Sequence, residues 1–285
     1  MGLAKGSIRT CVPRNIRNWL RSPAYSTEWI WDEIKYALGV RQIVQIRPGW
    51  FLLCHPAAYR FAYRAHNIDS EQVAEIDGFI AACRPGMALF DLGAHFGLFS
   101  LAALRYGGVD AKAIAVDPSP TASRMIRIQA NLNHVADRLT IVQASIGDHT
   151  GWRPMVAVGV LAAGYFVAPG RDHPDSELAR TRAITLDGLA HDSGILPTHV
   201  KIDVEGYEAE VLRGGRELLS HTESPLLFIE LHNQIIRERN NDPEESLALL
   251  RSLGYDIFAV NGDPLNKESV LSRPLIRIMA RKPRG

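Results

Sequence analysis

The pattern of hydrophobic and polar positions changes near residue 86. Beyond it, short apolar runs alternate with longer stretches in which apolar residues recur at helical spacing. The runs typical of strands are Met87–Leu92, Ala113–Val116, Leu139–Val142, Val200–Val204 and Leu226–Leu231. Helical spacing is found over Phe96–Tyr106 and Thr121–Asn133. Strands that alternate with helices indicate parallel βαβ units, so the pattern predicts a doubly wound, mostly parallel α/β sheet.

The end of the chain carries a different pattern. The stretch "NDPEESLALLRSLG" predicts a helix that Asp242 caps, with Pro243 in the first turn and Glu245 in a capping box. The runs Ile257–Val260 and Leu275–Ala280 predict a closing antiparallel pair, although the second comes late for a tight hairpin.

Residues 1–85 show no regular alternation of strand and helix. The stretch "STEWIWDEIKYALG" predicts one helix with Ser26 or Thr27 as its N-cap. The stretch "RQIVQIRPGWFLLCHP" predicts two short strands around the turn at Pro48 and Gly49. We therefore expect an N-terminal helical and β extension over residues 1–85, a candidate substrate cap, followed by the α/β domain over residues 86–285.

Composition adds few constraints. The 285 residues are 46% hydrophobic and 22% charged, with a net charge of +1, as in ordinary soluble globular proteins. The three cysteines have no CxxC spacing, and no signal peptide is evident, so we expect a reduced, cytoplasmic setting. The longest weakly polar run, Met155–Ala168, is too short to span a bilayer, and we interpret it as a buried core strand rather than an interfacial segment.

Basic residues are concentrated before the first acidic residue, Glu28. They are Lys5, Arg9, Arg14, Arg17 and Arg21. A solvated arm is the ordinary explanation of such a run. The alternative is contact with an anionic partner, such as a phosphate-bearing substrate or a membrane surface.

A glycine turn joins the first predicted strand to the next helix. The stretch "ALFDLGAHFGLFS" places Gly93 and Gly97 four residues apart, after Asp91. Glycine lets a backbone approach a ligand closely, and the start of a helix offers free N–H groups. The chain contains neither G-x-G-x-x-G nor a Walker A sequence, which argues against a dinucleotide. An acid beside the turn suits a ligand that carries an ammonium group and hydroxyls.

A second acid ends the next predicted strand. Asp117 in "AIAVDPSP" lies 24 residues beyond Gly93, about where an α/β fold places the carboxylate that binds a ribose. Open α/β sheets bind ligands beyond the carboxyl ends of their strands. Each aspartate alone is more often a helix cap, but together at two strand ends they predict ligand contact.

Six motifs carry a resemblance to a known family. In chain order they are "FDLGAHFGLFS", "AVDPSP", "ASIGDHTG", "TLDGL", "VKIDVEGYEAEVLRGG" and "LLFIELH". Their order and spacing resemble those of FkbM-type methyltransferases, over about residues 52–235. The resemblance implies an S-adenosylmethionine-dependent enzyme with a class I Rossmann-like fold. Two residues depart from the family's usual choices: His95, where asparagine is frequent, and Asp117, where glutamate is commoner.

The resemblance also implies which residues contact the cofactor. They are Asp91, Gly93, Ala94, His95, Gly97, Asp117, Ala144, Ser145 and Asp203. Asp91, Gly93 and Ala94 would face the methionine end of the cofactor. Asp117 would hold the ribose hydroxyls, and Ala144 with Ser145 would flank the adenine.

The candidate catalytic residues follow the fourth and fifth predicted strands. They are Asp203, Glu205, Glu230 and His232. Side chains two residues apart on a strand share a face, so each pair would point one way if the strand stays extended. An alcohol acceptor gains from a base as its O–H bond breaks, and a pKa of about 6.5 suits histidine to that role. We expect His232 to be the base and Glu230 to be its orienting partner.

Other roles for these residues remain open. His232 would otherwise satisfy a loop backbone group, and Glu205 would form a salt bridge or a helix N-terminal carboxylate. Lys201 is expected to pair with a neighbouring carboxylate, because a lone buried ammonium is costly. Mg²⁺ would use Asp203, Glu230 and either His232 or Asn233, but Mg²⁺ prefers oxygen ligands, so we expect no metal.

Three classes of function follow from these residues. The leading one is O-methylation of a hydroxyl on a small metabolite, such as a sugar or polyketide. The alternatives are a methyltransferase acting on protein or nucleic acid and a non-catalytic cofactor-binding scaffold. Because there is no N/D-P-P-Y/F motif and no large basic excess, we expect no nucleic-acid partner. Residues 1–85 and 152–185 are the segments expected to select the acceptor.

Overall fold

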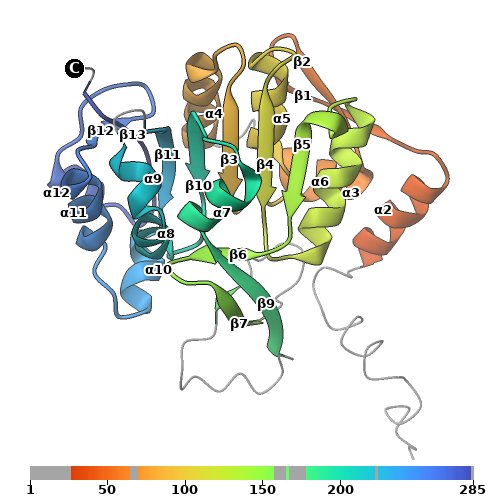
Figure 1. Ribbon diagram of the computed structural model, residues 1–285. Coiled ribbons are helices and arrows are strands. Elements are labelled where there is room, and N and C mark those ends of the chain that lie inside the picture. Colours follow the sequence, from red (N-terminus) through yellow and green to blue (C-terminus); the bar gives the residue numbers. More distant parts are fainter. Residues whose placement is uncertain (1–26, 65–69, 157–164, 167–177, 222–223, 284–285) are drawn as a thin grey trace, which may run out of the picture.

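The computed structural model describes residues 27–64, 70–156, 165–166, 178–221 and 224–283. Its centre is a seven-stranded sheet in the order β12-β13-β11-β10-β3-β4-β5 (Figure 1). The strands are β3 (Ala88–Leu92), β4 (Lys112–Val116), β5 (Leu139–Val142), β10 (His199–Ile202), β11 (Leu226–Leu231), β12 (Asp256–Ala259) and β13 (Ile276–Arg281). β13 runs antiparallel to both of its neighbours, while β5, β4, β3, β10 and β11 are parallel. The predicted class I fold, mostly parallel with an antiparallel C-terminal strand, is confirmed.

The strand order places a switch point between β3 and β10. From β3 the chain moves outward through β4 to β5, and it later returns to the other side of β3 with β10 and β11. The carboxyl ends of these parallel strands share one edge, the lower one in Figure 1. Loops that leave neighbouring strands at a switch point diverge, which leaves room for a ligand between them.

Helices follow most strands of the sheet. They are α5 (Leu98–Tyr106), α6 (Pro120–Leu132), a 3₁₀ turn (Ala136–Arg138), α7 (Leu186–Ser193), α8 (Glu208–Gly214), α9 (Arg216–Ser220), α10 (Asn233–Glu238), α11 (Glu244–Ser252) and α12 (Lys267–Leu271). At α11 the Asp242 side chain accepts a hydrogen bond from the Glu244 amide, 2.9 Å away. The predicted capping box is wrong, because the Glu245 side chain pairs with Arg213 instead of returning to the helix start.

A second, four-stranded sheet lies beyond the carboxyl edge of the first (Figure 1). Its strands are β6 (Ser145–Gly147), β7 (Gly151–Val156), β8 (Tyr165–Phe166) and β9 (Leu178–Thr185). The apolar pattern did not predict this sheet. Of the run Met155–Ala168, predicted as one core strand, the last two residues of β7 and all of β8 are described, and the rest lies outside the described residues.

The N-terminal segment contains the predicted helix and strand pair. Its elements are α2 (Thr27–Ala37), β1 (Gln42–Arg47), β2 (Trp50–Cys54), α3 (Pro56–Ala58), a π-helical turn (Tyr59–Tyr63) and α4 (Ser70–Ala82). Trp50 and Phe79 belong to the same buried cluster as Leu89 of β3 and Leu101 of α5. The Tyr63 hydroxyl donates to the Phe96 carbonyl at 2.6 Å, within the glycine turn.

These contacts join the segment to the sheet as one core, and its role as a substrate cap stays a prediction. Within the described part of the chain, every helix is too short or too polar to cross a bilayer.

Candidate functional site

The glycine turn after β3 lies directly against the end of β10. Gly93 and Gly97 have φ angles of 81° and 80°, in the left-handed region that favours glycine. A Cβ added at Gly93 would lie 1.8 Å from the carbonyl oxygen of Asp203. The turn therefore needs glycine at residue 93 for both its conformation and its space, and it fixes the start of the site beside Asp203.

Asp91 holds the start of α5 against β3. Its carboxylate accepts hydrogen bonds from the Ser100 amide at 3.0 Å and the Ser100 hydroxyl at 2.6 Å, and the residue is 1% exposed. Burial raises its pKa, although Ser100 and Lys201 act in the opposite direction. Its Oδ2 atom therefore ties α5 to β3, and the contact of Asp91 with the cofactor stays a prediction.

Asp117 joins the turn to the end of β4. Its oxygens accept hydrogen bonds from the amides of His95, at 2.9 Å, and Ser119, at 2.8 Å. Burial raises the pKa of Asp117 to about 7, against these two hydrogen bonds. Since a carboxylate accepts about four hydrogen bonds, two positions remain for the hydroxyls of a ligand. The ribose contact stays a prediction that this geometry permits.

The other residues that we expected to contact the cofactor are mostly buried or already in contact with neighbouring residues. Ala94 and Ala144 are buried, and the Ser145 hydroxyl donates to the Arg182 carbonyl of β9 at 3.2 Å. His95 has a φ of 49° and stacks on Phe96 with ring centroids 4.1 Å apart. The adenine contact at Ala144 and Ser145 stays a prediction, and any ligand there lies where β6 and β9 meet.

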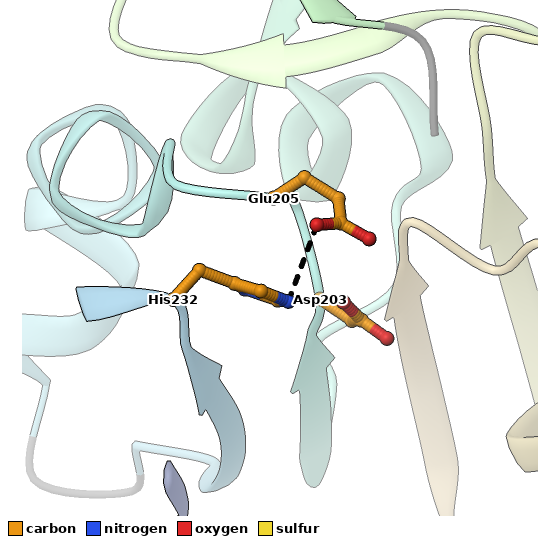
Figure 2. A group of neighbouring side chains, drawn as sticks. All are labelled: Asp203, Glu205 and His232. Atoms are coloured by element: carbon orange, nitrogen blue, oxygen red, sulfur yellow. Dashed lines mark ion pairs between the residues drawn. The ribbon is translucent and has the colours of Figure 1, made fainter. Parts of the chain in front are cut away.

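Asp203, Glu205 and His232 come together at the carboxyl edge (Figure 2). The His232 Nε2 atom lies 3.4 Å from Glu205 and 3.8 Å from Asp203. Glu205 reaches this position because its backbone is left-handed, with φ of 52°, and Gly206 follows with φ of 87°. The β10 strand is therefore no longer extended at Glu205, and the two acids meet through a tight turn rather than by strand alternation.

Glu208, which the sequence analysis missed, orients His232. Its Oε1 atom lies 2.8 Å from the His232 Nδ1 atom and also accepts the Gly206 amide at 3.0 Å. A carboxylate accepts only, so Nδ1 carries the proton and Nε2 faces the two other acids. The prediction that Glu230 orients His232 is wrong, because His232 leaves the strand with ψ of 65° at the start of α10.

The acids around His232 determine its charge. Burial would lower the pKa of His232, but the hydrogen bond to Glu208 and the charges of Asp203 and Glu205 raise it to about 9. Burial and the neighbouring charge of Glu230 raise the pKa of Asp203, and burial also raises that of Glu205. The site therefore favours imidazolium at neutral pH and disfavours ionisation of both neighbouring acids at once.

Glu230 belongs to a closed ring of buried ion pairs beneath the site. Lys201 lies 2.7 Å from Glu75 and 2.9 Å from Glu230. Arg277 lies 3.0 Å from each of the same two carboxylates. All four residues are at least nine-tenths buried. Pairing of Lys201 with a neighbouring carboxylate is confirmed, and its two partners raise its pKa despite burial.

The ring changes the set of residues that a metal would use. Both Glu230 oxygens are engaged, and the Asn233 amide donates to the Val270 and Arg273 carbonyls. One donor atom each from Asp203, Glu205 and His232 lies within 4.8 Å of the others. If a metal binds, Glu205 rather than Glu230 would complete its ligands.

The sequence comparison identifies the family. The model of the methyltransferase FkbM domain matches residues 91–257, more than half of the chain. The chain belongs to the FkbM methyltransferase family. No curated protein matches it.

Solved structures with a similar fold are distant in sequence. A precorrin-6y C5,15-methyltransferase from Geobacter metallireducens is 15% identical, with a TM-score of 0.43 over 76% of this chain and 90% of that one. A putative rRNA methylase from Clostridium thermocellum is 11% identical, with a TM-score of 0.46 over 76% and 99%. An S-adenosylmethionine-dependent O-methyltransferase from Thermotoga maritima is 11% identical, with a TM-score of 0.39 over 75% and 67%. At this distance none of them indicates the acceptor.

FkbM methyltransferases use S-adenosylmethionine, and the residues of this site fit it. Gly97 begins α5 without a side chain of its own to cap it, and although Asp91 takes the Ser100 amide, the earlier amides of the first turn suit the cofactor's carboxylate. Asp117 retains acceptor positions for the ribose. The acids beyond β10 complement the positive sulfonium and ammonium groups.

Replacing Asp117 by alanine should weaken cofactor binding about 10- to 100-fold, because ribose hydroxyls lose a charged acceptor. Calorimetric titration of S-adenosylmethionine into each protein measures this. Asp137→Ala, in the 3₁₀ turn before β5, is the matched control and should bind like the wild type. Equal affinity in Asp117→Ala and the wild type would overturn the assignment of Asp117 to the ribose. The membership of the chain in the family does not depend on that assignment.

Proposed function

We propose that the protein methylates a hydroxyl of a small polar metabolite, such as a sugar or polyketide, with His232 as the general base. The observation that carries the proposal is the Glu208–His232 pair, which turns Nε2 toward Asp203 and Glu205 at the switch point. S-adenosylmethionine supplies a methyl group that its sulfonium already makes electrophilic. The protein therefore has to orient the acceptor and remove its proton.

The roles of the chain's residues follow from this geometry. When neutral, His232 Nε2 accepts the hydroxyl proton, while Glu208 holds the ring and stabilises the imidazolium that forms. Asp203 and Glu205 are placed to accept hydrogen bonds from further hydroxyls of the acceptor and so to align it. Glu230 acts beneath them, through the ion-pair ring, as a positioning residue.

The charge of the site favours a neutral acceptor. Asp203, Glu205 and Glu208 lie around one imidazole, so a phosphate or carboxylate next to the reacting hydroxyl would be repelled. This supports a small polyhydroxylated acceptor over a nucleic acid, in which every nucleotide brings a phosphate.

The dependence of kcat/KM on pH should reveal the effect of Glu208 on the protonation of His232. With neither substrate saturating, kcat/KM should rise with pH through about 9, because the neutral imidazole is the base. Glu208→Gln removes the carboxylate that favours imidazolium, so the rise in kcat/KM should move to lower pH. Glu210 lies on the same helix and pairs with Arg239, so Glu210→Gln should leave the rise in kcat/KM at the same pH. A profile that is the same in all three proteins would contradict the pairing.

Activity should survive exhaustive treatment with EDTA, because a base at His232 makes a metal unnecessary for removing the acceptor proton. Methylated product measured by mass spectrometry, before and after EDTA and after adding Mg²⁺ or Mn²⁺, checks this. Loss of activity that either ion restores would reassign Asp203, Glu205 and His232 as metal ligands.

A screen of acceptors tests the function itself. The protein is incubated with methyl-labelled S-adenosylmethionine and panels of sugars, polyketides, peptides and oligonucleotides, and label in each product is measured. We expect label only on hydroxyl compounds and none with His232→Ala. Label on peptides or nucleic acid would overturn the proposal, as would binding of the cofactor with no turnover on any panel.

A further inference from the structure

Exposed large apolar side chains are concentrated in one segment of the described surface. Six of the nine lie between Trp31 and Phe51. They are Trp31, Ile34, Leu38, Val40, Ile43 and Phe51, which we call the apolar rim. Single exposed apolar residues are normal, but a group of this kind on a soluble domain marks an interaction surface.

Half of the rim is one face of α2. Trp31, Ile34 and Leu38 are three, four and seven residues apart, so they follow one another along the same side of the helix. Trp29 and Asp32, at 3% and 1% exposed, face the core from the opposite side. Trp31 and Leu38 are 61% and 78% exposed. The outer face of the helix is therefore apolar, whereas its buried face carries Trp29 and the ion-paired Asp32.

The rim continues into the β1–β2 hairpin. Val40 lies in the short connection from α2 to β1. Ile43 pairs with Leu53, which places Phe51 diagonally from Ile43 on the same face, about 7–8 Å away. Ile43 and Phe51 are 67% and 57% exposed. The connection thus joins two exposed apolar faces along one continuous segment.

A groove adjoins the rim where α2 meets α6. It has a volume of about 400 Å³, and its apolar lining is Trp29, Ile30, Ile34 and Pro120. Glu33 and Arg124 form two contacts of 2.7 Å in its wall. Ile34 belongs to both the groove and the rim, so the apolar surface continues from the rim into the groove.

The charge of the preceding sequence indicates what covers this surface. The 27 residues before Glu28 carry five basic side chains and no acidic one, while the rest of the chain is slightly negative. This run ends where α2 begins, about one turn before Trp31. An anionic partner is therefore drawn to the segment that carries the rim.

We propose that the apolar rim, together with the basic residues that precede α2 in the sequence (Lys5, Arg9, Arg14, Arg17 and Arg21), binds the protein to the surface of a membrane that contains anionic lipids. Tryptophan and phenylalanine insert favourably at the headgroup boundary, and basic residues are attracted to anionic headgroups. One weak apolar signal binds only marginally, whereas apolar and polybasic signals together give stable attachment. The proposal does not depend on the identity of the methyl acceptor.

Flotation with vesicles tests it. The full chain is mixed with vesicles of phosphatidylcholine alone, or with about 30 mol% phosphatidylglycerol added, and the fraction that floats is measured. The wild type should float with the anionic vesicles and not with the neutral ones. Trp31→Ser/Leu38→Ser/Phe51→Ser should lower the vesicle affinity at least about tenfold. Replacing Arg9, Arg14, Arg17 and Arg21 by glutamine should do the same.

The chain offers a matched control. Val109, Trp152 and Leu196 are 83%, 63% and 75% exposed outside the rim, and their joint replacement by serine should leave flotation unchanged. Circular dichroism and the urea midpoint verify that each variant is folded. A folded wild type that does not float, or a folded rim variant that floats like the wild type, overturns the proposal. A wild-type dimer in sedimentation that the rim substitutions abolish, without vesicle binding, assigns the surface to a second copy instead.

Discussion

Replacing His232 by alanine is expected to lower kcat by about 10²–10⁴, the usual contribution of a positioned general base. The imidazole acts on the acceptor's proton in the transition state, so the affinity for S-adenosylmethionine should change by no more than about threefold. Single-turnover rates and calorimetric titration separate the two effects. Because His232 lies at the start of α10 and is not within a strand, the alanine variant should fold.

The control for this experiment is His191→Ala, at a histidine whose side chain is 89% exposed on α7. It should turn over like the wild type. The rising limb of the pH profile should also disappear in His232→Ala, since no imidazole remains to lose its proton. A His232→Ala variant within about threefold of the wild type at every pH would show that His232 is structural, and the base would have to be sought at Asp203 or Glu205.

Replacing Lys201 by methionine is expected to lower the free energy of unfolding by about 3–5 kcal/mol. The substitution keeps most of the side-chain volume but leaves Glu75 and Glu230 with one cation between them, out of contact with water. Urea unfolding followed by circular dichroism measures the loss. Adding Glu75→Gln to Lys201→Met should recover part of it, because the ring then regains charge balance.

The matched control is Lys267→Met, which removes an exposed ion pair with Glu244. Such pairs contribute about 0–1 kcal/mol, so this variant should be nearly as stable as the wild type. A Lys201→Met protein that loses less than about 1 kcal/mol would mean that water or relaxation compensates the buried carboxylates, and the ring would not be a principal source of stability.

Sequence periodicity predicted the sheet better than it predicted the site. The strands at residues 88–92, 112–116 and 226–231 are mostly apolar on both faces, with one charged residue each, so a short apolar run predicts them locally. The β6–β9 sheet was missed because its strands are short or continue across residues of mixed polarity, and their pairing partners are distant in the sequence. Periodicity carries no information about which strands will pair across such distances.

At the site, the reasoning from strand alternation failed after β10 and β11. It assumed that Glu205 and His232 continue extended strands, whereas both follow the strands in turns. Glu208 had one available signal: it stands three residues after Glu205 at the start of the predicted helix, where a carboxylate is common. That its partner is His232 depends on the angle between two loops, which no local pattern specifies.

The ion-pair ring also determines how much of the chain must be present for folding. Its four members come from α4, β10, β11 and β13, so Glu75 and Arg277 lie outside the 91–257 segment that matches the family. A fragment limited to that segment would leave Lys201 and Glu230 with half of their partners. The part of the chain that folds as one unit is therefore longer than the segment that matches the family model. Exchanging flanking segments between relatives would succeed only where the residues at 75 and 277 are transferred together.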